Sequence, residues 1–158
     1  YTSQIVLYPD PILTTPCADV DENITMTEYM WFVGEFAYIM SKYKGIGVAA
    51  NQIGLSYNIC AMIDQDNQST HLFINPQLLG VSMSENSQEE DYESCLSLPN
   101  YEPIPVIRYK DITVSHFDCV NRKTIYSTLH NMNARILLHE MDHLQGKTIL
   151  NPGNGWTK

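Results

Sequence analysis

The sequence predicts one α+β domain over residues 1–158, with small antiparallel or mixed sheets packed around a central helix that carries a His-Glu-x-x-His motif. Three observations lead to this class. Two segments show the apolar spacing of amphipathic helices, short strand-like runs lie between them, and no repeat, linker or low-complexity tract divides the chain. A length of 158 residues with 44% hydrophobic residues suits a single domain with a sizeable core.

The first expected helix follows an extended or looped start, because three prolines lie within residues 1–20. Thr25 and Glu28 fit a capping box, in which hydroxyl and carboxylate satisfy free N–H groups at a helix start. Apolar residues then recur at helical spacing as far as Tyr43, and the helix is expected to end at Lys42, Lys44 and Gly45.

Strand-like runs occupy the middle of the chain, separated by turn-forming Gly, Pro, Asn and Asp. They cover residues 57–63, 71–74, 106–109, 112–117 and 124–127. An acidic run between Glu85 and Glu93 is expected to be a solvated loop. Helical spacing returns from about Met132 to Leu144, and Gly146 is expected to close this second helix.

Charge and cysteine content limit the partners and the compartment. Nine Lys+Arg against 18 Asp+Glu give a net charge of −9, which argues against nucleic acids and anionic membrane surfaces as partners. The chain shows no apolar stretch long enough to cross a bilayer, and because no Lys or Arg precedes Lys42 we expect neither a secretory leader nor a transit peptide. Four widely spaced cysteines without a CxxC pair indicate free thiols in a reducing compartment. We therefore expect a cytoplasmic protein.

A metal site is predicted in the second helix. His139 and His143 lie four residues apart, so both imidazoles can reach one metal ion from the same helical face. Glu140 lies where a general base would contact a metal-bound water. The alternative is a helix that carries two surface histidines by chance. Residues 144–158 contain no Asp, Glu, His or Cys, so a third ligand must come from upstream.

The upstream candidates are the four cysteines, three histidines and several carboxylates. Cys95 lies in a segment with small polar neighbours and a terminating proline, which suggests a turn that points a thiolate into a cleft. The other cysteines are more typical of small buried residues. His71 and His116 fall in strand-like runs, where a structural role is the commoner one. Spacing alone leaves Cys95 as one candidate among these.

The third segment of interest runs from Gly45 to Gly54. Its start matches GxGxxA, but a helix precedes the glycines where a dinucleotide-binding fingerprint requires a strand. Glycines here would let another chain approach the backbone closely, with Gln52 offering an amide donor. The alternative is a tight turn followed by a pair of core alanines.

Together the segments 45–52 (GIGVAANQ), 93–97 (ESCLS) and 139–144 (HEMDHL) resemble the three motifs of the peptide deformylase family. The resemblance implies removal of the N-formyl group from the initiator methionine of newly made polypeptides. It implies one divalent metal ion, characteristically Fe²⁺ with Zn²⁺ or others able to replace it, held by Cys95, His139 and His143. The metal would activate a water for attack on the formyl carbonyl.

The same resemblance assigns roles to further residues. Glu140 would take the proton from the water and pass it to the departing amine. The side-chain amide of Gln52 and the backbone N–H of Leu96 would stabilise the oxyanion. Three residues would hold the substrate backbone in an extended form beside a pocket for the methionine side chain: Gly45, Ile46 and Gly47.

The chain departs from the family pattern at Ser94, Leu138 and Asn100, none of which is a proposed ligand, base or oxyanion donor. Only fifteen residues follow His143, and in this the chain resembles the C-terminally short members of the family, some of which are encoded by phages. With the charge of −9, this leads us to expect no tight docking on ribosomal RNA. The compartment would be the bacterial cytoplasm, including that of an infected host. Two alternative functions are a metal-dependent endopeptidase and a catalytically idle metal- or peptide-binding module.

Overall fold

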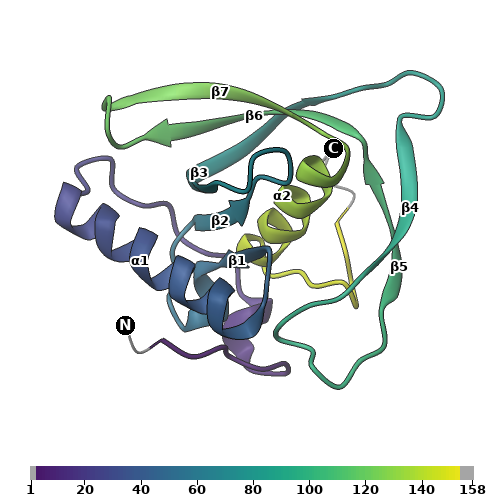
Figure 1. The fold of residues 1–158 in the computed structure, drawn as a ribbon, viewed down its shortest axis with the longest axis horizontal. Helices are drawn as coiled ribbons and strands as arrows, with labels where there is room; N and C mark the ends of the chain where they lie inside the picture. Colours follow the sequence, from purple (N-terminus) through teal and green to yellow (C-terminus); the bar gives the residue numbers. More distant parts are fainter. Residues whose placement is uncertain (1–2, 154–158) are drawn as a thin grey trace.

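Two α-helices and two antiparallel sheets account for most of the chain in the computed structural model, which describes residues 3–153 (Figure 1). In chain order the elements are η1 (Pro11–Thr14), α1 (Met26–Tyr43), β1 (Gly47–Ala49), η2 (Ala50–Ile53), β2 (Ile59–Ile63), β3 (Thr70–Val81), β4 (Gln88–Glu93), β5 (Ile104–Tyr109), β6 (Asp111–Asp118), β7 (Lys123–His130) and α2 (Asn131–Leu144). The predicted α+β class is confirmed. Residues 1–2 and 154–158 of the predicted domain lie outside the described residues.

Five strands form the larger sheet in the order β1-β2-β3-β6-β7, and β4 pairs with β5 in a separate two-stranded sheet. All these strand pairs are antiparallel, so of the two expected sheet types the antiparallel one is found. The long helix α2 lies between the two sheets and packs against β1 and β2 on one side and β5 on the other (Figure 1).

The helix α1 begins with the predicted capping box. The Thr25 hydroxyl accepts the Glu28 N–H at 3.1 Å, and the Glu28 carboxylate accepts the Thr25 N–H at 3.0 Å. Its end lies where it was predicted, and Lys44, with φ 57°, takes the left-handed capping position next to Gly45. A capping Lys at positive φ is uncommon, and the Lys44 N–H donates to the carbonyl of Met40 in the usual way.

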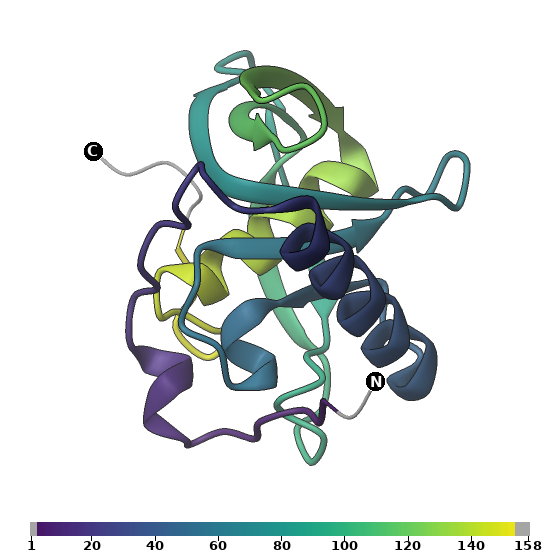
Figure 2. The ribbon, with the colours of Figure 1, turned by 90° about the vertical axis from the view of Figure 1, so that its left-hand side faces the viewer.

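Strand β2 shows how the two helices come to cover opposite faces of the larger sheet. Ile59 and Ala61 pack in the cluster that contains the apolar residues of α1, and Cys60 and Met62 pack in the cluster that contains those of α2. This alternation follows from the two-residue period of a strand. Figure 2 looks from the α1 side, with α1 in front of β2 and the yellow-green α2 behind it. Cys60 is thus a small buried residue, as the sequence predicted for the cysteines other than Cys95.

The expected acidic loop is wrong, since residues 88–93 form β4, paired in register with β5 from Gln88↔Tyr109 to Glu93↔Ile104. Acidic residues are depleted in strands, so a segment with four acidic residues in six did not indicate a strand. All side chains of β4 except Glu93 are exposed, so burial does not penalise their charge.

The predicted strand at 71–74 was also too short, because β3 continues to Val81 through a register shift between Ile74 and Gln77. No helix among the described residues is long and apolar enough to cross a membrane.

Candidate metal centre

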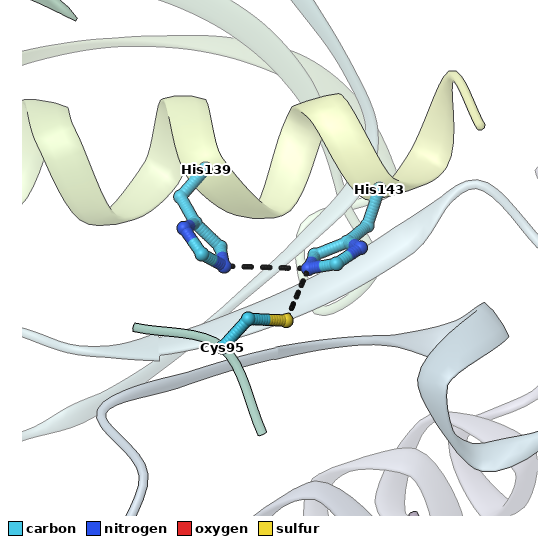
Figure 3. A group of neighbouring side chains, drawn as sticks. All are labelled: Cys95, His139 and His143. Atoms are coloured by element: carbon cyan, nitrogen blue, oxygen red, sulfur yellow. Dashed lines mark hydrogen bonds between the residues drawn. The ribbon is translucent and has the colours of Figure 1, made fainter. Parts of the chain in front are cut away.

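Three of the predicted site residues converge at the middle of the molecule (Figure 3). His139 and His143 project from consecutive turns of α2, and Cys95 reaches them from the loop after β4. The Nε2 atom of His143 lies 3.3 Å from Nε2 of His139 and 3.4 Å from Sγ of Cys95. All three candidate ligand atoms fall within 4.8 Å of one another. In residues 3–153 this is the one group of three metal-ligating side chains that converges in this way.

The other candidate ligands are placed elsewhere. Cys60 and Cys119 are buried in the core clusters, Cys17 is partly buried, and all the cysteines are free thiols. His116 is buried in β6 against Phe73 and bonds the Ser127 hydroxyl at 2.9 Å through Nε2. The structure therefore selects Cys95 among the alternatives that spacing left open.

The orientation of His139 is set by Glu93. Nδ1 of His139 lies 2.8 Å from Oε1 of Glu93, so its N–H donates to that carboxylate and Nε2 is the ring nitrogen that faces the cluster. Burial opposes protonation of His139, but the charge of Glu140 and the contacts with Cys95 and Glu93 raise its pKa to about 10. The negative groups around the cluster thus favour a positive charge at or next to the His139 ring.

Glu93 is itself held by two arginines. Arg108 donates to both carboxylate oxygens at 3.0 and 2.9 Å, and Arg135 donates to Oε2 at 2.6 Å. Burial would raise the pKa of Glu93, but the hydrogen bonds from His139 and Arg108 outweigh it and hold the pKa well below its usual range. Arg108 also bonds Asp142 of α2 at 2.5 Å, so one guanidinium ties β4, β5 and α2 together.

The sequence did not predict this charged network. Glu93 belongs to one of the three motifs, but no role was predicted for it. A signal was present. Arg108 lies in an otherwise apolar strand-like run, and Arg135 lies among Ala134, Ile136 and Leu137. An arginine inside an apolar run requires a buried acidic partner. Which carboxylate that partner would be depends on contacts across 15 residues for Arg108 and 42 for Arg135.

Glu140 lines the cavity beside the cluster, and its buried Oε1 has no hydrogen-bond partner among the described residues. Burial raises the pKa of Glu140 to about 7, against the opposing charge of His139. Gly47 makes room for this side chain, because a Cβ at Gly47 would lie 2.5 Å from the Oε2 atom of Glu140. Glu140, the predicted base, thus lies close to the Gly47 backbone, while the expected approach of another chain to these glycines stays a prediction.

His143 is completely buried. Burial and the charge of His139 lower its pKa well below the usual range, so the ring is neutral. A neutral imidazole is the form that binds a metal ion.

Gln52, on η2, is fixed with its amide aimed at Cys95. Its Oε1 accepts the Ala49 N–H at 3.0 Å, and its Nε2 donates to the Ser97 hydroxyl at 3.1 Å and contacts Sγ of Cys95 at 3.7 Å. The alternative prediction for residues 45–54, a tight turn followed by a pair of core alanines, holds in part, because Ala49 and Ala50 are fully buried core residues.

A cavity of about 380 Å³ opens beside the cluster. Its wall includes Gly45, Ile46, Gly47 and Leu96, the other residues that the resemblance singled out. A Cβ at Gly45 would lie 2.8 Å from Cδ1 of Leu96, so glycine lets the two segments meet. A cavity of this size suits a small apolar side chain with a few polar groups around it.

Comparisons with known proteins point to one family. The family model described as polypeptide deformylase matches residues 2–158. A peptide deformylase of Dictyoglomus thermophilum is 33% identical over 141 residues, which is 89% of this chain and 86% of the relative. The crystal structure of peptide deformylase from Thermotoga maritima is similar with a TM-score of 0.83 at 25% identity, covering 97% of this chain and 99% of that one. That of a probable peptide deformylase from synechococcus phage S-SSM7 has the same TM-score and identity and covers 94% and 98%.

Proposed function

Because this chain belongs to the polypeptide deformylase family, enzymes that remove the N-formyl group from newly made peptides, we propose that it does so through a metal ion held by Cys95, His139 and His143. The observation that carries the proposal is the convergence of these three donors beside a buried carboxylate without a partner. One thiolate and two imidazoles leave a further coordination position for substrate or water, as catalytic metal sites require.

The residues present fit such an ion. The Nδ1 contact of His139 with Glu93 leaves Nε2 free to bind, and the neutral His143 offers Nε2 on the same side. Cys/His₂ ligation suits Fe²⁺ and Zn²⁺ alike, and we propose Fe²⁺ on the family resemblance. When bound, the ion supplies Lewis acidity at the formyl group.

Glu140 is proposed to move the proton. A carboxylate with a pKa near 7 can accept a proton from water and return it to the leaving amine at neutral pH. Its unpartnered Oε1 and its place on the cavity wall support this role.

Gln52 and Leu96 are proposed to stabilise the carbonyl oxygen as it gains charge. The side-chain amide of Gln52 is fixed by two hydrogen bonds, one accepted by Oε1 and one donated by Nε2, and Nε2 is aimed at the cluster, so it requires no reorganisation to donate there. The backbone N–H of Leu96 is the second proposed donor, one residue after the cysteine. Gly45, Ile46 and Gly47 border the same cavity and are proposed to bind the extended substrate backbone beside the methionine pocket.

The chain is proposed to form one catalytic domain that acts in the cytoplasm, where Cys95 stays reduced. The family match over residues 2–158 supports the single domain, and the free thiols support the compartment. The absence of nucleic-acid binding remains a prediction from the net charge of −9.

The proposal is tested by following amine release from formyl-Met-Ala-Ser under anaerobic conditions, with protein reconstituted in parallel with Fe²⁺ or Zn²⁺. Wild type should turn over, and Glu140→Gln should lose at least about a hundredfold in rate with full metal content. Cleavage of unfolded casein without deformylation would support an endopeptidase instead. Binding of formyl peptide without turnover by metal-loaded wild type would support an idle binding module.

A further inference from the structure

A second large cavity lies near the start of α1, away from the metal centre. It measures about 760 Å³. We call it the acidic-aromatic groove and define it by Asp19, Asp21, Glu28, Trp31, Phe32 and Tyr57, all of which line it. Lys44, which borders the cavity of the metal centre, follows Trp31 by thirteen residues. At 1.5 Å per helical residue, Trp31 and Lys44 lie about 20 Å apart along α1, so the two cavities are near opposite ends of this helix.

Three aromatic rings make one continuous wall of this groove. Phe32 contacts Trp31 edge-to-face at 5.1 Å and Tyr57 edge-to-face at 6.3 Å between ring centroids. Phe32 is buried, whereas Trp31 and Tyr57 are 44% and 47% exposed. The two outer rings are therefore fixed by the inner one and still present surface to a ligand. Aromatic ring faces attract cations, and Trp does so most strongly.

The groove also carries uncompensated negative charge. Asp19 accepts a hydrogen bond from the Asn58 amide, and Asp21 accepts one from the Asn23 N–H, each at 2.8 Å. Glu28 accepts bonds from Thr25 in the capping box. These donors are neutral, none of the three carboxylates forms an ion pair within residues 3–153, and no Lys or Arg lines the groove.

Arg122 contacts the loop that precedes α1, which contributes part of the groove wall. Its guanidinium donates to the backbone carbonyls of Ile24 and Glu22, each at 2.6 Å, and lies over the Phe117 ring. It thus holds the loop in place through neutral acceptors and leaves the carboxylates available.

We propose that the acidic-aromatic groove binds a Lys/Arg-rich peptide segment of a partner protein. A long basic side chain matches both parts of the wall, because its alkyl stem packs on aromatic rings while its charged head reaches the carboxylates. A second copy of this chain is a poorer occupant, because two chains of net charge −9 repel one another. Phosphate-bearing partners are repelled for the same reason. This proposal does not depend on the deformylase activity.

The test uses fluorescence anisotropy with a labelled octapeptide of alternating Lys and Ala, and a Glu/Ala peptide as the charge-reversed probe. Asp21→Asn/Glu28→Gln removes two charges from the groove, while Asn keeps the turn acceptor and Gln at this position keeps the capping box. Glu89→Gln/Glu90→Gln, on exposed positions of β4, removes the same charge elsewhere and is the matched control. Trp31→Ala removes the outer ring, with the fold checked by circular dichroism.

The Lys/Ala peptide should bind wild type and the β4 control within about twofold of each other. Asp21→Asn/Glu28→Gln and Trp31→Ala should each bind at least about tenfold more weakly, without change in deformylase rate. Equal weakening by both double variants would show mere attraction by net charge and would overturn the proposal. So would no binding of the Lys/Ala peptide, equally tight binding of spermidine, or self-association of wild type that Trp31→Ala abolishes.

Discussion

Replacing Glu93 with Gln is expected to destabilise the protein strongly. The Glu93 carboxylate receives two hydrogen bonds from Arg108, one from Arg135 and one contact from His139, with distances from 2.6 to 3.0 Å. The side chains of Glu93, Arg108 and Arg135 are only 6%, 1% and 9% exposed. Gln keeps the shape but removes the charge and faces an N–H₂ group toward guanidinium donors. Breaking a buried pair from one side costs about 3–5 kcal/mol.

The loss is measured by urea unfolding at pH 7, followed by far-ultraviolet circular dichroism. Because domains of this size are stable by about 5–15 kcal/mol, a loss of this size is a large shift of the midpoint. Glu90→Gln, an exposed position of the same strand, is the control and should change stability by less than about 0.5 kcal/mol. A Glu93→Gln effect no larger than that of the control would refute the reasoning.

The pH dependence of this difference follows from the lowered pKa of Glu93. A carboxyl group whose pKa falls on folding stabilises the native state above its unfolded pKa, about 4.3, and this contribution is lost as the pH falls toward the folded pKa. The gap between wild type and Glu93→Gln should therefore be full at pH 7 and shrink below about pH 4. Metal affinity, measured by competition with a chelator, should fall about 10–100-fold because His139 loses the negatively charged acceptor that raises its basicity.

Three other changes have defined outcomes. Gly47→Ala should cost about 1–3 kcal/mol in thermal unfolding and slow deformylation, because its Cβ would displace Glu140; Gly80→Ala, where a Cβ meets nothing within 4 Å, should do neither. Thr25→Ala should cost about 1 kcal/mol in urea unfolding by removing the helix cap, with no change in rate per folded molecule. Removing the metal with a chelator should lower the melting temperature, and restoring Fe²⁺ should recover it; an unchanged melting temperature would argue against a bound ion.

The helices were predictable because their signals are local. The Thr25 and Glu28 capping box and the apolar spacing behind it lie within one segment, and the structure shows both. The strand β4 was not predictable in this way, because its acidic composition resembles a solvated loop. Its partner β5 begins eleven residues after its last residue, Glu93, and pairing with that strand decides the outcome.

The metal cluster was predictable in part. The spacing of His139 and His143 predicted two candidate ligands, and the three-motif resemblance added Cys95, which the structure places beside them. The support from Glu93 and the two arginines depends on distant contacts that no local pattern encodes. The roles of Glu140, Gln52 and Leu96 in catalysis stay predictions.

The most direct test of the central claim is the deformylation rate as a function of metal content. Metal-free protein, prepared anaerobically, would be loaded with increasing Fe²⁺ and assayed on formyl-Met-Ala-Ser in the same aliquots. We predict no turnover without metal, a linear rise to a plateau at one ion per chain, and no such rise for Cys95→Ala. Full activity of the metal-free protein, or equal activation of Cys95→Ala, would contradict the account.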